Sequence, residues 1–527
     1  MYKRQVLYAR LAVPSPVEVP AEKYSQFTKR NYIDDFVLAK LKSLRVEPSP
    51  LAGDAMFLRR AFLDGAGILP TPEEVEDFLN DKSLNKREKL IDYVLAKEES
   101  VDYWAYKWSD LMLVSSKKLG PVGMRSFYNW IRESVKENKP WNQFANEILT
   151  SSGSSRENGA LNYFVLHKDP IDLTENVVQA FLGQRLTCAR CHNHPLEKWT
   201  QKQYFQMANL FSRVGLKNGA SPGDTIVFAR SSGDINHPRL LKPLPPTPLD
   251  GEPMSLDSQE DRRAHFSKWL TSPKNSFFSR NLVNRVWGNY MGRGLTDPVD
   301  DVRATNPASN AELFDALVQD FSKDFNVKRL MKTIMMSTTY QLSSEPNASN
   351  QNDGKYYSHY ILKRLPAESL LDAISQVSGM PTPFDGYPAG TRAMQLPDVL
   401  VKSEFLNAFG RPKRVICDAG ERSSDPSIAQ ALHVINGDTL NRKLAAKDGV
   451  VGLFLKLGLS DSRMIEQVYL SAFSRNPTES EKQRAVELLK SSRLPKGTAE
   501  LQLQARRQGV EDLLWALLTS KEFLFNQ

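Results

Sequence analysis

The stretch NSFFSRNLVNRVWGNYMGRG, from Asn275 to Gly294, gives the clearest indication of fold in this chain of 527 residues. Four of its large apolar side chains form one stripe, namely Phe278, Leu282, Val286 and Tyr290. Two further apolar side chains, Val283 and Trp287, lie beside this stripe. This spacing predicts a helix that buries one face. We expect Gly292 and Gly294 to end the helix, because glycine commonly follows a helix C-terminus.

The same helical spacing recurs on both sides of this stretch. On the N-terminal side we expect helices within 24–114, 124–149, 172–185 and from Thr200 onward. On the C-terminal side we expect them at 311–321, 328–336, 367–378, 428–445 and from Asp461 to the end. Trp104 and Trp108 stand one helical turn apart, which is typical of core residues.

Two helix starts are marked by capping boxes. Thr71-Pro72-Glu73-Glu74 combines a capping threonine, a proline in the first helical position and a glutamate three residues after the cap. Thr200 and Gln203 form the second such pattern. The first lies in AFLDGAGILPTPEEVEDFL, which resembles YLSAFSRNPTESEKQRAVELL near the end. We interpret the pair as two uses of one helix–turn–helix unit and not as a repeat array.

Helical spacing is interrupted between Val214 and Asp261. Gly, Pro, Ser and Asp accumulate there, TIVFAR (225–230) reads as a short strand, and KPLPPTP reads as extended chain. We therefore predict a mainly α, multi-helical protein of two domains, with a small β hairpin and extended linker between them. The predicted bounds are 1–25 for a disordered or artefactual N-terminus, 26–213 and 262–527 for the domains, and 214–261 for the linker.

Composition excludes several classes of protein. Hydrophobic residues make up 41% and charged residues 25%, as in a globular protein. The net charge of +8 is modest for this length, and no dense Lys/Arg run is interleaved with aromatics, so nucleic acid is not an expected partner. No apolar run is long enough for a transmembrane segment. Three cysteines exclude a disulfide scaffold.

The N-terminus begins MYKRQ, which resembles translated sequencing-adaptor read-through. We therefore expect that the true start, with any signal peptide, is missing. The lack of an export signal is then no argument for the cytoplasm.

Two of the three cysteines lie in LTCARCHNHPLEKWTQ, from Leu186 to Gln201. The spacing Cys188-x-x-Cys191-His192 is typical of covalent haem c, with both cysteines in thioether bonds and His192 as the axial iron ligand. A zinc site that adds His194 would be cramped. A thioredoxin-like pair would need a βαβ context that this helical region lacks, and a chance grouping of reduced cysteines is the fourth interpretation.

The sixth iron ligand has several candidates in the sequence. Met207 lies in the following helix and would raise the reduction potential, although apolar packing beside Phe211 is the favoured interpretation of this residue. His167 and His433 are the other candidates, and an open position would indicate ligand binding or redox catalysis.

The stretch DPVDDVRATNP places Asp297, Asp300 and Asp301 beside Arg303 and Asn306. Three carboxylates this close could hold calcium, or two of them could act as an acid/base pair. The alternative is an irregular loop in which the aspartates cap turns and pair with arginines, including the upstream Arg285 and Arg293.

The stretch CDAGERSSDPSIAQALHVING, from Cys417 to Gly437, offers a second polar group. Gln430, His433 and Asn436 are three residues apart and, with Glu421 and Arg422, could line a pocket for a sugar or an anion. A polar layer between domains explains them as well. A cysteine protease based on Cys417 and His433 is disfavoured, because no oxyanion hole is evident.

Long stretches of this chain resemble known families. FLRRAFLDGAGILPTPEEVEDFL and VVQAFLGQRLTCARCHNHPLEKWTQKQYFQMANLF resemble the planctomycete-type cytochrome c domain, which we assign to 26–213. The following stretches resemble its planctomycete-specific partner domain, assigned to 262–527: NSFFSRNLVNRVWGNYMGRGLTDPVDDVRATNP, TIMMSTTYQLSS and NAFGRPKRVICDAGERSSDPSIAQALHVING. Both are catalogued as domains of unknown function.

The resemblance implies an exported or periplasmic protein, and it leaves three hypotheses open. The first is a c-type haem protein that exchanges electrons with a redox partner protein. The second is a carbohydrate-active enzyme that acts on acidic or sulfated glycans. Its site would contain Asp300, Asp301, Arg303, Glu421, Arg422 and His433. The third is a structural protein of a surface assembly.

Overall fold

The computed structural model describes residues 11–422, 430, 437–493 and 497–527, and it is mainly helical, as predicted. The helices before the interruption are α1 (Ala21–Ser25), α2 (Tyr32–Leu44), α3 (Asp54–Gly65), α4 (Pro72–Asn80), α5 (Lys86–Ala96), α6 (Glu98–Leu111), α7 (Ser116–Lys136), α8 (Trp141–Thr150), α9 (Asn162–Leu166), α10 (Pro170–Val177) and α11 (Gln201–Ala208). Those after it are α12 (Arg262–Leu270), α13 (Ser276–Met291), α14 (Ala311–Phe321), α15 (Val327–Met336), α16 (Thr338–Gln341), α17 (Ala367–Ser378), α18 (Glu404–Ala408), α20 (Asp438–Leu444), α21 (Val450–Lys456), α22 (Asp461–Phe473), α23 (Glu479–Ser491), α24 (Ala499–Leu518) and α25 (Lys521–Leu524).

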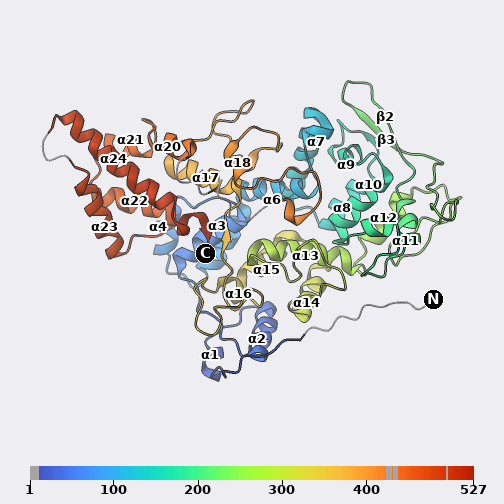
Figure 1. Cartoon of the computed structure of the whole chain (residues 1–527), viewed down its shortest axis with the longest axis horizontal. Coiled ribbons are helices and arrows are strands. Elements are labelled where there is room, and N and C mark those ends of the chain that lie inside the picture. Colours follow the sequence, from blue (N-terminus) through green and yellow to red (C-terminus); the bar gives the residue numbers. More distant parts are fainter. Residues whose placement is uncertain (1–10, 423–429, 431–436, 494–496) are drawn as a thin grey trace.

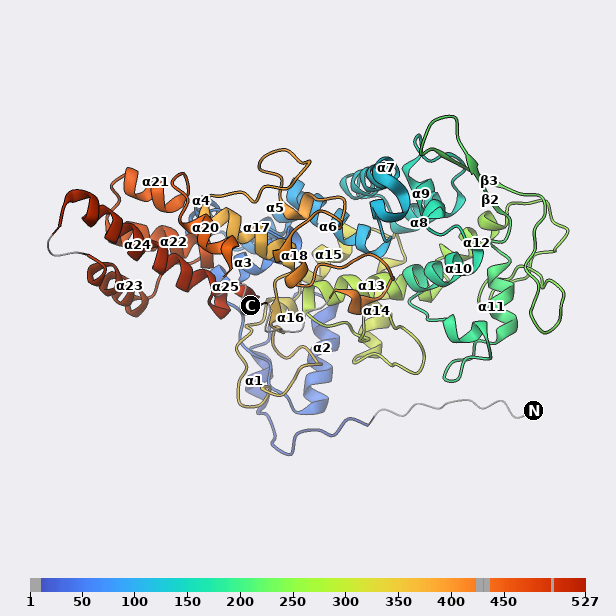
Figure 2. The same cartoon turned by 45° about the horizontal axis from the view of Figure 1, so that its top comes forward.

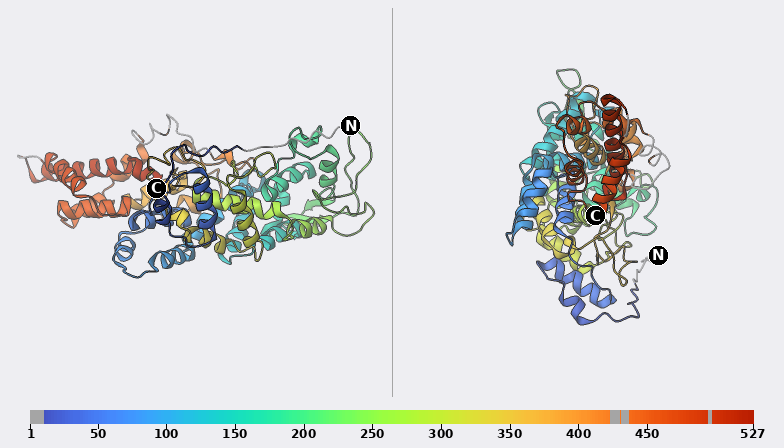
Figure 3. Two further views of the ribbon diagram at one scale, coloured as in Figure 1. Left: turned by 90° about the horizontal axis from the view of Figure 1, so that it is seen from below. Right: turned by 90° about the vertical axis from the view of Figure 1, so that its left-hand side faces the viewer.

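Short helical turns and strands complete the fold. The turns are the 3-10 helices η1 (Gly159–Leu161), η3 (Thr187–Arg190), η4 (Ala393–Gln395) and η5 (Ala419–Glu421), and the π-helix η2 (Val178–Leu182). The strands are β1 (Gly153–Ser154), β2 (Val214–Asn218), β3 (Thr225–Ala229), β4 (Lys363–Arg364) and β5 (Phe525–Asn526). The molecule is elongated, with α22, α23 and α24 at one end and the β2–β3 hairpin at the other (Figure 1). The end-on view in Figure 3 shows how α1 and α2 project from the side.

The predicted interruption between the two helical regions contains the predicted strand. β3 lies at the centre of a three-stranded antiparallel sheet, between β1 and β2. Its partner β2 precedes it directly in the chain, so the two form the predicted hairpin. The predicted helix at 428–445 lies partly outside the described residues, and its described part contains α20.

The opening stretch forms α13 as predicted. All six apolar side chains of its stripe are buried, and Gly292 ends the helix at φ 77°, a conformation that glycine adopts without strain. The predicted capping boxes of Thr71 with Glu74 and of Thr200 with Gln203 are both formed. Local sequence therefore determines these helix ends.

The two similar stretches form the same local unit. α3 leads into α4 through the Thr71 cap, and α22 leads into α23 through an equivalent capping box of Thr478 and Glu481. α4 also contacts α22, so the two units lie side by side although they are at opposite ends of the chain. This contact brings the first helices against the C-terminal helices.

Two hydrophobic cores organise the molecule. The larger core collects side chains from α2 through α16, on both sides of the segment 214–261. The second core is built from α17 to α25 and also takes Leu63 and Leu69 from the α3–α4 unit. Helices from the two sides pack directly, as α8 does with α12 and α5 with α15. No helix among the described residues is both long and apolar enough to cross a membrane.

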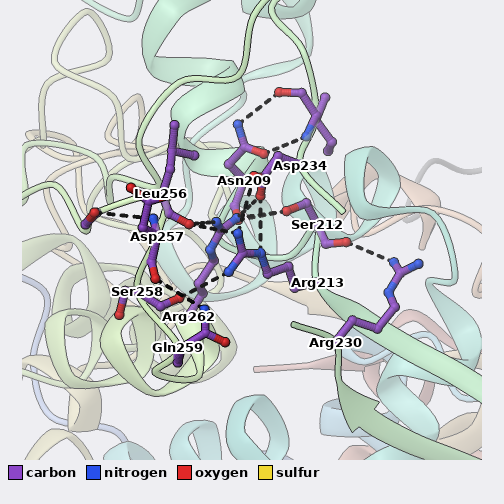
Figure 4. Close-up of polar contacts among 12 residues, drawn as sticks. Asn209, Ser212, Arg213, Arg230, Asp234, Leu256, Asp257, Ser258, Gln259 and Arg262 are labelled. Atoms are coloured by element: carbon purple, nitrogen blue, oxygen red, sulfur yellow. Dashed lines mark hydrogen bonds and ion pairs between the residues drawn. The ribbon is translucent and has the colours of Figure 1, made fainter. Parts of the chain in front are cut away.

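An arginine clamp fastens the extended segment 230–261 onto the helices. Arg262 of α12 is buried, pairs with Asp234 at 2.7 Å, and donates to the Asn209 carbonyl at 2.9 Å. Arg213 pairs with the same Asp234 and donates to the carbonyls of Leu256 and Ser258 (Figure 4). Because backbone carbonyls of the segment accept these bonds, the segment is held in place without regular secondary structure.

Replacement of Arg262 tests this clamp. Arg262→Met retains the apolar stem but removes the guanidinium, so the Asn209 carbonyl loses its charged donor and keeps the Ser212 hydroxyl, and Asp234 keeps only Arg213. We expect a loss of about 2 kcal/mol in the free energy of unfolding. Urea titration of the purified chain measures it. Lys202→Met, on the exposed side of α11, is the control and should change the free energy by less than about 0.5 kcal/mol.

Candidate functional site

The segment from Cys188 to His192 lies at the surface between η2 and α11. The π-helix η2 ends at Gly183, whose φ of 61° turns the chain away from the core. The 3-10 helix η3 then carries the first cysteine, and Cys191 is its C-cap. Both thiols are exposed and neither is in a disulfide. They are therefore accessible for covalent attachment of another group.

Cys188 lies in η3 and Cys191 follows it directly, three positions further on. A 3-10 helix has three residues per turn, so side chains three positions apart stand one above the other. His192 follows at once and is also exposed. Its Nδ1 lies 2.8 Å from the carbonyl oxygen of Asn193, which makes Nδ1 the protonated donor. The Nε2 atom of His192 has no hydrogen-bond partner among the described residues and is the nitrogen free to bind a metal.

His194 has a different role from His192. It is buried, and its Nδ1 accepts hydrogen bonds from the backbone N–H groups of Leu196 and Glu197 at 3.2 and 3.0 Å. Burial, together with the charges of Arg303 and His192, lowers its pKa despite the opposing charge of Glu197. The neutral ring of His194 thus holds the loop in place through these two hydrogen bonds.

Gln201 at the start of α11 fixes the segment from below. Its side-chain amide donates to the carbonyls of Arg190 and Cys191, both at 3.0 Å. Its backbone N–H donates to the Asn193 side chain at 3.0 Å. Buried Trp199 adds a bond to Gln184 at 3.3 Å. The exposed segment is therefore held in one conformation.

These residues fit covalent haem attachment. Two accessible thiols stand three positions apart at a 3-10 turn, and the adjacent imidazole is oriented by a backbone carbonyl, a usual arrangement for a metal-binding histidine. The fit concerns attachment and the proximal ligand only.

The predicted sixth ligands lie elsewhere. Met207 is fully buried in the larger core, so its role as a ligand stays a prediction. His167 is buried edge-on against Tyr163, with ring centroids 5.0 Å apart, and its Nε2 has no hydrogen-bond partner in the described chain. His433 lies outside the described residues.

Burial of His167 makes the stability depend on pH. Burial, with the charge of Lys118, lowers its pKa from 6.5 to about 3. The unfolded state therefore binds the proton more readily, and stability is lost as pH falls from 6.5 toward 3. We expect the free energy of unfolding of the parent chain to fall by about 2–3 kcal/mol more than that of His167→Leu between pH 6.5 and 4.5. Urea titrations at both pH values measure this difference. An equal loss of unfolding free energy in the parent chain and in His167→Leu would contradict the prediction.

Comparison with known families decides the identity of the chain. Residues 32–215 match the PSCyt2 family, described as a protein of unknown function (DUF1549). Residues 262–489 match the PSD1 family, described as a protein of unknown function (DUF1553). The chain contains a PSCyt2 domain followed by a PSD1 domain. No curated protein and no solved structure matches it.

The name PSCyt2 belongs to a planctomycete cytochrome-like domain family, and the segment with both exposed cysteines lies inside the match. The recognition of both families from the sequence is thereby confirmed. The matches begin and end at other residues than the predicted domains, whose bounds stay predictions.

The structure joins the PSCyt2 cysteine segment to the PSD1 loop DPVDDVRATNP. Arg185, just before the cysteines, pairs with Asp300 at 3.1 Å and with Asp418 at 3.0 Å. On the other side of the segment, Glu197 accepts from the backbone N–H of Thr305 at 3.2 Å and from its hydroxyl at 2.6 Å. Two stretches that the sequence assigns to separate domains thus form one surface region.

The three aspartates of this PSD1 loop have separate partners. Asp297 pairs with Arg293 at 3.2 Å, and Asp301 with Arg303 at 2.9 Å, whereas Asp300 pairs with Arg185. Burial raises the pKa of Asp301 against the opposing charges of Arg303 and Arg185. In the described chain, no three His, Cys, Asp or Glu side chains gather as a metal site. These contacts agree with the interpretation in which the aspartates pair with arginines. They do not support a calcium site.

Arg422 belongs to a partly buried ion-pair cluster between α6 and α17. It pairs with Asp110 of α6 and Glu368 of α17, both at 2.7 Å. Asp110 also pairs with Arg414 at 2.8 Å, and Glu368 accepts from the Tyr106 hydroxyl at 2.9 Å. Burial acts to raise the pKa of Glu368, but the charge of Arg422 outweighs it and holds that pKa below its usual value. The cluster ties the 411–422 segment to α6.

The remaining predicted residues of this stretch are also engaged. Glu421 accepts from the backbone N–H groups of Val415 and Ile416 at 2.8 and 3.4 Å. Gln430 accepts from Arg364, whereas His433 and Asn436 lie outside the described residues. Burial raises the pKa of the Cys417 thiol to about 11, so it is protonated at neutral pH and a poor nucleophile.

A cavity of about 390 Å³ opens beside this cluster. It lies between α6 and α13, whose Trp104 and Tyr290 rings have centroids 6.0 Å apart; both helices are in the middle of the molecule (Figure 2). Its walls include Lys107, which sequence reasoning missed. The signal was available: Lys107 stands on the same helical face as Trp104, Trp108 and Leu111, a single cation in an apolar stripe.

Proposed function

We propose that this PSCyt2–PSD1 chain is an exported c-type haem protein with a redox or electron-transfer role. Haem would be attached to Cys188 and Cys191, with His192 as the axial ligand. The observation that carries this proposal is the motif itself, with two exposed thiols three positions apart at a 3-10 turn. The cytochrome-like name of the matched family agrees with it.

Each residue of the segment has a defined task in this proposal. The sulfur atoms of Cys188 and Cys191 form the covalent bonds. His192 holds its Nδ1 proton on the Asn193 carbonyl at 2.8 Å and so directs Nε2 outward as the ligand. Gln201 keeps the backbone of the segment fixed. Haem bound in this way supplies one-electron redox chemistry.

The position of the segment supports electron exchange with a partner protein. Its thiols and His192 are exposed, so a group attached there would lie near the surface. A short distance from the surface to the attached group is what a redox partner protein requires, and we therefore propose such a partner. We also propose a periplasmic or otherwise exported location, because the family resemblance implies it.

The carbohydrate-active alternative has less support from the contacts. Asp300, Asp301, Arg422 and Glu421 each have a charged or backbone partner, so none is displayed as a free acid or base. The alternative keeps one supporting observation, the cavity beside Arg422.

Expression of the chain with a signal peptide and cytochrome c maturation machinery tests the proposal. We expect a purified protein with a Soret band that persists after denaturation and acid–acetone extraction, and an intact mass increased by one haem. Reaction of the reduced form with CO then separates an open sixth position from one closed by a side chain such as Met207. A mass equal to that of the bare polypeptide would refute haem attachment.

A further inference from the structure

The cavity between α6 and α13 contains two cations without counter-charges. Lys107 has no hydrogen bond or ion pair among the described residues, and its Nζ lies 4.9 Å from the centre of the Tyr103 ring. Arg285 uses its Nε to donate to Asn281 at 3.1 Å. Its Nη2 is buried and has no partner in the part of the chain that the structure describes.

The carboxylates on the cavity wall are already engaged. Asp110 is shared by Arg414 and Arg422. Asp418 pairs with Arg185 at 3.0 Å and accepts from the Gly420 N–H at 2.7 Å, and Glu421 accepts from two backbone N–H groups. A partly buried cation without a partner is unfavourable, because it loses hydration and gains no ion pair. The Lys107 amine and the Arg285 Nη2 atom are therefore the donors in this cavity that an anion would satisfy.

The rest of the lining is largely apolar. It includes the indole rings of Trp104 and Trp108, whose centroids are 5.3 Å apart, with Leu111, Val299, Pro412 and Ile416. A volume of about 390 Å³ is within the range of small-molecule sites. An apolar wall beside a pair of cations suits a small molecule with one flat apolar part and one anionic group.

We propose that this cavity binds a small organic anion, whose carboxylate or sulfonate group is received by Lys107 and Arg285 and whose body lies against Trp104 and Trp108. The pKa of Lys107 is lowered to about 8, chiefly by burial and by the charge of Arg422, yet the amine remains largely charged at neutral pH. Neither Cys188 nor Cys191 lines this cavity, and the proposal does not depend on haem attachment.

Isothermal titration calorimetry with benzoate tests the proposal on the full-length chain at low ionic strength. We expect benzoate and benzenesulfonate to bind and benzyl alcohol, which is neutral and of similar shape, not to bind. Lys107→Met and Arg285→Gln should each weaken benzoate binding at least about tenfold. Lys202→Met, which removes one exposed charge from α11, should leave it unchanged. Comparison of the affinities of benzoate and benzenesulfonate shows which of the two oxyanions, carboxylate or sulfonate, the cavity prefers.

Ile416→Trp provides a second, steric test. Ile416 is exposed and lines the cavity, so a larger side chain there fills the space without removing a cation or a core residue. We expect it to weaken benzoate binding as well. No binding of either anion, equal binding of benzyl alcohol, or parental affinity in the three cavity variants would overturn the proposal. Cys188→Ser/Cys191→Ser should bind benzoate like the parent, which separates this site from the haem proposal.

Discussion

The double variant Cys188→Ser/Cys191→Ser is expected to lose all covalently bound haem when it is matured under the same conditions as the parent chain. Serine has nearly the size of cysteine but cannot form a thioether, and both thiols are exposed with no structural partner. The fold should therefore be retained while attachment is abolished. The measurements are the Soret absorbance after acid–acetone extraction and the intact mass.

The third cysteine supplies the matched control for this variant. Cys417 is buried and lies outside the Cys-x-x-Cys-His spacing, so Cys417→Ser should keep the full Soret band. His192→Ala should change the spectrum of the bound haem, because the axial ligand is removed, whereas His194→Ala should retain the axial ligand. A double serine variant that keeps extraction-resistant haem would disprove attachment at these two residues.

The second large effect is expected for Asp64→Ala in α3. The Asp64 carboxylate is buried and pairs with Lys363 at 2.7 Å. It also accepts from Asn526 at 2.7 Å and from the hydroxyls of Tyr360 and Tyr340 at 2.8 and 3.1 Å. Its removal leaves the Lys363 cation without its counter-charge, with only the Asn289 and Tyr290 carbonyls as acceptors, and two buried hydroxyls without their acceptor. We expect a loss of about 3–5 kcal/mol in the free energy of unfolding, measured by urea titration.

An exposed aspartate on the next helix is the control for Asp64. Asp77 of α4 is exposed, and Asp77→Ala should change the free energy of unfolding by less than about 0.5 kcal/mol. Asp64→Asn keeps the shape and part of the hydrogen bonding. Its loss of unfolding free energy should therefore lie between those of Asp64→Ala and Asp77→Ala. Equal stability of Asp64→Ala and Asp77→Ala would show that the carboxylate does not tie α3 to β4 and β5.

The helices were predictable because their information is local. The stripe of α13, the caps at Thr71 and Thr200, and the strand at 225–229 all depend on residues within a few positions of each other. The spacing of Cys188, Cys191 and His192 is likewise local. The two bonds of Gln201 that hold this segment were not predictable, since glutamine after a capping threonine indicates only a helix start.

The sites that depend on distant segments could not be predicted in this way. Asp300 and Asp301 were grouped as a candidate metal or acid/base site, but Asp300 pairs with the distant Arg185, whereas Asp301 pairs with its neighbour Arg303. Arg422 was expected to line a pocket, and its partners Asp110 and Glu368 lie in helices far from it in the sequence. Which charged residues of such segments pair is decided by tertiary packing. The spacing of residues along the chain does not predict that packing.

The sequence by itself determined the helical class, the ends of the main helices and the haem-type motif, because each follows from side chains within one or two turns. Only the tertiary structure decided that PSCyt2 and PSD1 helices share one hydrophobic core, and that Lys107 and Arg285 face a common cavity while nearby carboxylates are taken by other arginines. The physical reason is that a charge has a partner, or lacks one, only after distant segments have packed together.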